Sequence, residues 1–151
     1  MDKICCFMLT EPKGGSDATH IGTTATKTEG GWLINGAKKW SGNGTFADYL
    51  LVWATNPSED NNIQCFVVTK GTPGIKIKQV PNNYSLRMVE YADATFENVF
   101  VPDNMKLTLA KDFARGTAKI LASSRIHVCW AAAGVATGAY EAAIKYCLNR
   151  N

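Results

Sequence analysis

The residues that could do chemistry are concentrated near the start of the chain, where a short apolar run gives way to small, polar and turn-forming residues. The segment reads Leu9-Thr10-Glu11-Pro12-Lys13-Gly14-Gly15-Ser16-Asp17. A loop of this composition exposes several backbone N–H groups and hydroxyls together, which suits a phosphate or the acceptor-rich edge of a ring. Ordinary turns use the same residue types, so the composition by itself leaves both interpretations open.

Metal and disulfide chemistry find little support in the rest of the sequence. The two histidines, His20 and His127, are far apart and lack the spacing of metal ligands. The cysteines are odd in number and show neither a CxxC pair nor the framework of a small secreted protein, which predicts reduced thiols in an intracellular protein. They are Cys5, Cys6, Cys65, Cys129 and Cys147.

The composition is that of a globular protein. The 151 residues fit one ordinary domain, and with 46% hydrophobic residues, 19% charged residues and a net charge of +3 the chain lies outside the disordered class. No Lys/Arg run is longer than Lys38-Lys39, which predicts lysines scattered on a solvated face and argues against a nucleic-acid-binding surface. No apolar run is long enough to predict a membrane span.

The elements that must position the loop are predicted to be strands up to about Pro102. Short β-branched or aromatic stretches alternate with Gly, Pro and Asn, without helical patterns between them, which favours an antiparallel β-sandwich or barrel. The expected strands cover residues 23–28 and 32–34, joined by a turn at 29–31, and then residues 49–53, 63–68, 75–78 and 94–101. The stretch from Asn56 to Asn62 is expected to be a solvent-exposed loop.

After Pro102 the sequence becomes alanine-rich, with apolar residues at helical spacing. This pattern predicts one long helix, or two, from about Phe113 to Leu148. Ala131, Gly134 and Gly138 give the helix a stripe of small residues, which we expect to serve packing against a neighbouring helix. Because the first hundred residues offer no helical partner, we expect that partner to lie outside this chain.

The sequence resembles the family of acyl-CoA dehydrogenases and acyl-CoA oxidases. Its first loop matches the family signature in which Thr-Glu-Pro is followed two residues later by a small residue and then by Gly-Ser-Asp. Within the family, it is most similar to plant-type peroxisomal short-chain acyl-CoA oxidases, with glutaryl-CoA dehydrogenases next. Further landmarks follow in the family's order: Trp32–Trp40, Phe46-Ala47-Asp48, Pro73-Gly74-Ile75, Leu86-Arg87-Met88 and Glu97–Pro102.

The resemblance implies a fold in which β structure precedes α structure. Residues 1–104 would form the family's middle domain, an antiparallel β-sandwich or barrel. Residues 105–151 would begin the helical C-terminal domain and include only its first long helix. The chain is therefore expected to be a fragment of a longer enzyme that forms a homodimer or homotetramer.

FAD is the cofactor that the resemblance implies. Leu9 and Thr10 would offer hydrogen bonds to the pyrimidine side of the flavin, and Trp40 would place a broad apolar face beside the ring. Arg150 would reach the FAD pyrophosphate of a neighbouring subunit. The residues expected to contact FAD are Phe7, Met8, Leu9, Thr10, Gly15, Ser16, Trp40, Ser41, Gly42 and Arg150.

Two residues depart from the family pattern around the flavin loop. Met8 and His20 stand where the family usually has smaller residues. Both would enlarge the side chains next to the cofactor. A histidine on the surface after a turn is the alternative interpretation of His20.

The acyl-CoA substrate would contact Ser16 and Arg125. Its α,β-desaturation, a step of fatty acid β-oxidation, needs a base for the α-proton and an acceptor for the hydride from the β-carbon. Glu11 lies inside the signature, but the family's catalytic glutamate belongs to the C-terminal helical domain. We therefore expect no catalytic residue in this chain and a structural role for Glu11.

Gly42 is relevant to the question of which molecule reoxidises the reduced flavin. Dehydrogenases of the family usually carry a threonine there that reaches flavin N5, whereas oxidases tend to have glycine. This favours an oxidase whose flavin is reoxidised by oxygen, in a peroxisome, although close backbone approach explains a glycine equally well. The alternatives are a dehydrogenase that passes electrons to an electron-transfer flavoprotein in the mitochondrial matrix, and a non-catalytic β-sandwich binding module.

Overall fold

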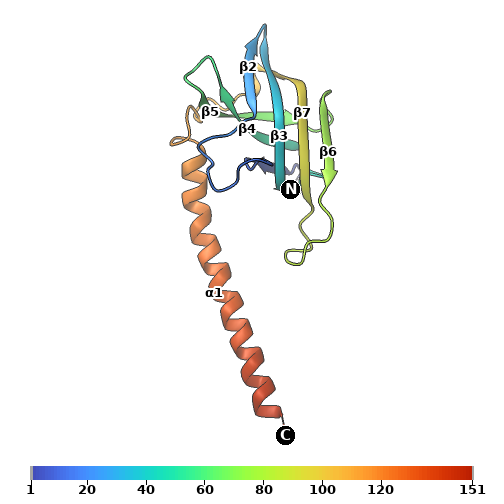
Figure 1. Cartoon of the computed structure of the whole chain (residues 1–151), viewed down its shortest axis with the longest axis vertical. Helices are drawn as coiled ribbons and strands as arrows, with labels where there is room; N and C mark the ends of the chain where they lie inside the picture. Colours follow the sequence, from blue (N-terminus) through green and yellow to red (C-terminus); the bar gives the residue numbers. More distant parts are fainter. Residues whose placement is uncertain (1, 151) are drawn as a thin grey trace. The chain divides into compact units, whose positions relative to one another are not determined.

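The computed structural model describes residues 2–150 and falls into two compact units, Met1–Gly116 and Thr117–Asn151. The first unit contains a seven-stranded sheet, and the second contains the helix α1 (Thr117–Asn149) (Figure 1). The predicted class, a β domain followed by a long helix, is confirmed. The predicted domain boundary at residue 104 concerns the longer enzyme and stays a prediction.

The sheet has the order β1-β4-β2-β3-β7-β6, and β5 pairs with β4 off this path. All predicted strands are present, and β3 and β7 are longer than expected, at 12 residues each. Most neighbours are antiparallel, as predicted, but β4 pairs in parallel with both β1 and β2. The strands are β1 (Cys5–Met8), β2 (Thr24–Thr28), β3 (Gly31–Gly42), β4 (Tyr49–Asn56), β5 (Asn62–Thr69), β6 (Ile75–Gln79) and β7 (Tyr91–Pro102).

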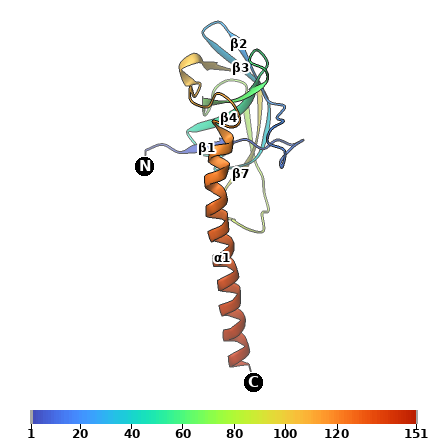
Figure 2. The same ribbon diagram turned by 90° about the vertical axis from the view of Figure 1, so that its left-hand side faces the viewer.

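Strand β1 was not predicted, and it leads directly into the candidate loop. It has four residues and lies beside β4, in a register from Cys5 opposite Tyr49 to Met8 opposite Val52 (Figure 2). A parallel pairing joins segments far apart in the sequence, so there is no hairpin turn from which the sequence could indicate it. The sheet thus holds the start of the loop in place through a long-range contact.

The core of the first unit is built by alternate residues of the strands. Strand β7 illustrates the pattern, because Ala92, Ala94 and Phe96 are buried while the residues between them are not. Complete burial of an aliphatic or aromatic side chain contributes about 1.5–3 kcal/mol relative to exposure. The largest fully buried apolar side chains are Trp53, Phe66, Phe96, Met8, Ile34, Leu50, Val52, Val68, Val99 and Val101.

Strand β3 is irregular at two points that matter for the site. Its register with β7 shifts between Ile34 and Gly36 and again between Lys38 and Ser41. Gly36 has φ +146° and Trp40 has φ 58°, so both shifts include a residue with positive φ. At the first shift the extra residue lies on β7, between Phe96 and Val99. At the second it lies on β3, between Lys38 and Ser41, where the bulge changes the direction of the side chains that follow.

The second unit consists of one continuous helix, which settles the prediction of one helix or two. Its 33 residues give it a length of roughly 50 Å. Its apolar residues are spread around the helix and are not confined to one stripe, which is typical of a helix that packs on several sides. Across residues 2–150, no helix is both long enough and apolar enough to cross a membrane.

Candidate functional site

The loop after β1 lies against the second half of β3. The Lys39 N–H donates to the Thr10 carbonyl at 2.8 Å, and the Lys38 ammonium donates to the Leu9 carbonyl at 3.0 Å. A Cβ at Gly15 would lie 3.8 Å from Thr10 Cγ2, so the turn folds back beside Thr10. The structure therefore brings three of the predicted contact residues next to the strand segment that bears Trp40, Ser41 and Gly42.

The Trp40–Gly42 segment presents an aromatic face and an unsatisfied hydroxyl. Trp40 is 49% exposed, in contrast to the core tryptophans Trp32 and Trp53. Ser41 is buried, and its Oγ has no hydrogen-bond partner within the described residues. A buried hydroxyl without a partner is uncommon, since desolvating it is costly. The segment thus combines an exposed aromatic side chain with a buried hydroxyl that has no hydrogen-bond partner within the described residues.

A buried ion pair fixes the loop. The Lys38 ammonium donates to Glu11 Oε1 at 2.8 Å, and the Lys38 side chain is 0% exposed while that of Glu11 is 10% exposed. Glu11 Oε1 also accepts from the Thr23 N–H at 2.9 Å, and Oε2 accepts from the Gly22 N–H at 2.7 Å. The carboxylate therefore joins the loop to β3 and to the segment before β2.

The prediction that the lysines lie scattered on a solvated face is wrong for Lys38. The residue occupies an inward position of β3, and its ammonium is enclosed by Glu11 and the Leu9 carbonyl. A lysine is fully buried almost only when it is paired. The sequence offered one signal, since Lys38 lies four residues after the core residue Ile34, an even spacing that places both side chains on the inward face of β3.

The pKa values of the pair reflect burial and mutual attraction. Desolvation tends to raise the pKa of Glu11, but hydrogen bonds from Lys38 and Thr23 outweigh it and leave this pKa below its usual value. Desolvation lowers the pKa of Lys38, and Glu11 offsets part of this effect. Glu11 is an acceptor for three donors, which agrees with the structural role expected for it.

Phe7 and Met8 differ in what they can offer a ligand. Phe7 is half-buried, with its ring centroid 5.8 Å from that of Trp53. Met8 is fully buried in the core, so its side chain does not enlarge the loop surface as expected. Any contact of Met8 with a cofactor would have to come from backbone atoms.

The turn after Gly15 is exposed and held by Asp17. Ser16 is exposed, as a substrate contact requires. Asp17 Oδ1 accepts from the Thr19 N–H at 3.1 Å, and Asp17 Oδ2 lies 2.8 Å from His20 Nδ1. His20 is itself exposed, in line with the interpretation of a surface histidine after a turn.

We expect the Asp17 carboxyl to titrate with a pKa of about 2, below its ordinary value of 3.8, because it accepts hydrogen bonds from Thr19 and His20. Since the folded-state pKa is lowered, the contribution of this turn to stability is complete above the unfolded value and disappears as the pH falls through about 2. A carbon-detected NMR titration measures it. A Thr19→Ala variant should move the midpoint upward, and an unchanged midpoint would contradict the assigned cause.

Arg125 and Arg150 lie in the second unit. The guanidinium of Arg150 lies 5.9 Å from the ring centroid of Tyr146, one helical turn earlier. Arg125 lies within α1. Their roles toward acyl-CoA and the FAD pyrophosphate stay predictions.

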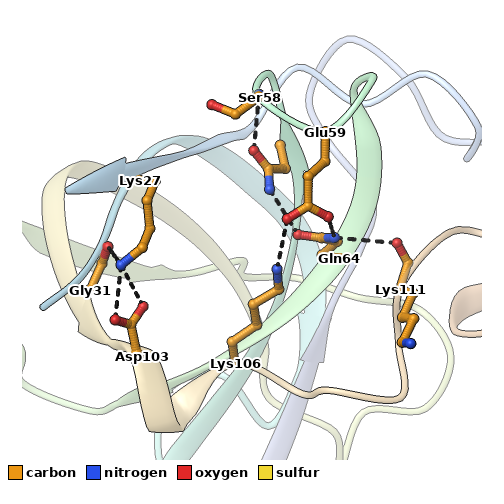
Figure 3. Close-up of polar contacts among 9 residues, drawn as sticks. Lys27, Gly31, Ser58, Glu59, Gln64, Asp103, Lys106 and Lys111 are labelled. Carbon is orange, nitrogen blue, oxygen red and sulfur yellow. Dashed lines mark hydrogen bonds and ion pairs between the residues drawn. The ribbon is translucent and has the colours of Figure 1, made fainter. Parts of the chain in front are cut away.

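A second polar cluster joins the β4–β5 turn to the segment after β7 (Figure 3). The buried Gln64 amide donates to Glu59 Oε2 at 2.7 Å and to the Lys111 carbonyl at 3.3 Å, and it accepts from the buried Asn56 at 3.1 Å. Lys106 pairs with Glu59 at 3.5 Å. The bonds among these groups hold the segment after β7 against the β4–β5 turn.

The predicted 56–62 loop is exposed from Pro57 to Asn61, whereas Asn56 is buried in this cluster. Nearby, Cys65 is also buried, and desolvation raises the pKa of its thiol to about 12, as it raises that of Cys6 to about 11. Such thiols are poor nucleophiles. Among residues 2–150, no three His, Cys, Asp or Glu side chains are grouped so that they could hold a metal ion.

Comparisons with known proteins agree with this geometry. The sequence profile of the family described as "Acyl-CoA dehydrogenase, middle domain" matches residues 6–99. The mitochondrial short-chain specific acyl-CoA dehydrogenase of Mus musculus is 34% identical over 152 residues, which cover 99% of this chain and 37% of the relative. The chain thus spans little more than a third of that relative's length.

Solved structures give the same result. Glutaryl-CoA dehydrogenase from Mycobacterium smegmatis superposes with a TM-score of 0.91 at 33% identity, over 99% of this chain and 38% of that one. A structure of a glutaryl-CoA dehydrogenase from the same organism in complex with FADH2 superposes with a TM-score of 0.71 at 35% identity, over 76% of this chain and 29% of that one.

Proposed function

The chain belongs to the acyl-CoA dehydrogenase family, and we propose that it is part of an FAD-dependent enzyme that oxidises an acyl-CoA thioester to its α,β-unsaturated product. The observation that carries the proposal is the attachment of Leu9 and Thr10 to Lys38 and Lys39, directly before Trp40–Gly42 in the same strand. FAD supplies the hydride acceptor, since no protein side chain accepts a hydride. The similarity to the glutaryl-CoA dehydrogenase structure in complex with FADH2 supports FAD as the cofactor.

The residues present fit a flat ring system. Trp40 offers an exposed indole, and Ser41 Oγ is a buried polar atom without a protein partner. Leu9 and Thr10 are held against β3 and would bind the pyrimidine side of the ring. Ser16 and Arg125 would orient the acyl-CoA, and Arg150 would reach the pyrophosphate of FAD in a second subunit.

Glu11 is unsuited to remove the α-proton. Its carboxylate accepts hydrogen bonds from Lys38, Gly22 and Thr23, and these bonds stabilise the charged form and leave it a weak base. We therefore place the base outside these 151 residues, in the longer enzyme. The role of Glu11 in this chain is to hold the loop that faces the cofactor.

For the electron acceptor, we favour an electron-transfer flavoprotein over oxygen. The relatives compared above are named dehydrogenases, and they give no support to the predicted oxidase or to its peroxisomal location. The mitochondrial names among them favour the mitochondrial matrix. Gly42 also has a packing explanation, because a Cβ there would lie 3.2 Å from Val89 Cγ1.

The proposed function is tested by the longest natural form that contains this chain. We expect it to purify with tightly bound yellow flavin and to reduce an artificial electron acceptor in the presence of acyl-CoA. The purified 151-residue chain should show no turnover and should lose FAD on gel filtration, because a positioned base and part of the cofactor site are missing. A colourless long form would favour a non-catalytic β-sandwich module.

We expect Gly42→Thr and Gly42→Ala, made in the long form, to leave the ratio of reoxidation by oxygen to reoxidation by a dye within about twofold of the parent. Both add the Cβ that meets Val89, but only threonine adds a hydroxyl. Stopped-flow reoxidation measures both rates. A roughly tenfold fall in the oxygen ratio for Gly42→Thr alone would restore the oxidase interpretation.

A further inference from the structure

The Glu11–Lys38 pair touches both ends of the candidate loop. The Lys38 ammonium holds the Leu9 carbonyl, where the loop begins, at 3.0 Å. The Glu11 carboxylate holds the Gly22 and Thr23 amides, where the loop ends, at 2.7 and 2.9 Å. The two side chains are joined at 2.8 Å. One ion pair therefore closes residues 9–23 into a loop and attaches that loop to β3.

We propose that this pair is a positioning device, which holds residues 9–23 in the shape that contacts the flavin before the cofactor binds. The inference rests on the proposed function. Glu11 and Lys38 act through the backbone of Leu9, Gly22 and Thr23, so they are positioning residues. A loop that is ordered in advance loses less conformational entropy on binding, which raises its affinity for the ligand.

The charges of Glu11 and Lys38 contribute more to the shape of the loop than to the stability of the fold. A buried ion pair is often no more stabilising than apolar side chains of the same volume. Hydrogen bonds to charged groups are directional, however, and here they specify three backbone groups that apolar contacts could not align. Replacing both charges together should therefore loosen the loop without unfolding the sheet.

The first experiment uses the double variant Glu11→Met/Lys38→Met of the 151-residue chain. We expect its thermal midpoint to stay near that of the parent. Hydrogen exchange at the Gly22 and Thr23 amides and tryptic cleavage after the exposed Lys13 should each become at least about tenfold faster. The Phe66 amide in β5 is the internal reference and should not change. Parent-like exchange and cleavage would overturn the proposal.

Glu11→Asp tests the same contacts if the double variant does not fold. Aspartate retains the charge but is one methylene shorter, so it cannot reach Lys38 and both amides together. Exchange at Gly22 and Thr23 should rise about threefold, between the parent and the double variant. No acceleration in this variant would overturn the proposal equally.

The effect of the pair on cofactor binding is measured in the long form by fluorescence titration with FAD. The double variant should raise the dissociation constant for FAD at least about tenfold while leaving the thermal midpoint of the flavin-free protein near the parent value. An unchanged dissociation constant would show that the loop is not ordered for the flavin, whatever its exchange rate. If the parent long form binds no FAD, the proposed function fails, and the exchange experiment still decides whether the pair positions the loop.

Discussion

Lys38→Met is expected to lower the free energy of unfolding of the first unit by about 3–5 kcal/mol. Methionine is close to lysine in length but carries no charge. It would leave the largely buried Glu11 carboxylate with backbone donors alone and the Leu9 carbonyl without its partner. An uncompensated buried charge is strongly destabilising, and the apolar contacts of methionine do not offset it. Urea unfolding followed by tryptophan fluorescence measures the change.

Lys39→Met is the matched control for this prediction. The same substitution one residue later removes an ammonium that lies 5.2 Å from the centroid of the Trp40 ring, and it leaves the Lys39 N–H bond to Thr10 in place. We expect a loss of about 0.5–1 kcal/mol. If the two variants differ by less than about 1 kcal/mol, the buried pair is not the strong contact described here.

The effect of Lys38→Met should also depend on pH. The pKa of Glu11 is lowered in the folded state, so the ionised carboxylate stabilises the fold above its ordinary pKa of 4.5, and this contribution is lost as the pH falls through the lower folded value. In the Lys38→Met variant the hydrogen bond from Lys38 that lowers this pKa is absent. The difference in unfolding free energy between parent and variant should therefore narrow in acid, and a constant difference would contradict the assigned cause.

Gly36→Ala is expected to destabilise the first unit by about 2–5 kcal/mol. Gly36 has φ +146°, which L-residues rarely adopt, and its Cβ would lie 2.6 Å from Thr23 Oγ1 and 2.7 Å from Thr23 Cα. Because one of these atoms belongs to the backbone, the segment before β2 would have to shift. Thr23 donates its N–H to Glu11, so the same variant should speed hydrogen exchange at Thr23.

Gly30→Ala is the control, at the turn of the same β2–β3 hairpin. Gly30 also has a positive φ, of +70°, but nothing lies within 4 Å of its Cβ position. Its cost is therefore backbone strain alone, about 1–2 kcal/mol. Urea unfolding of both variants separates strain from overlap, and equal losses would show that the contact with Thr23 is unimportant.

Much of the candidate site could be predicted because the family signatures are short and contiguous. The segment from Phe7 to Ser16 and the segment Trp40–Gly42 were both expected to face the flavin, and the structure joins Leu9 and Thr10 to Lys38 and Lys39, directly before Trp40. The environment of single side chains could not be predicted. Met8 points into the core, and Gly42 lies against Val89, which follows it by almost fifty residues.

The sequence by itself determined the β domain, the long helix and the membership in a flavoenzyme family. Alternation, turn residues and helical spacing act over a few residues, so they can be read without knowing the fold. Only the tertiary structure decided that β1 joins the sheet, that β3 bulges at Trp40, and that Lys38 is buried against Glu11. Those features depend on register between distant segments, and a shift of one residue reverses which side chains face inward.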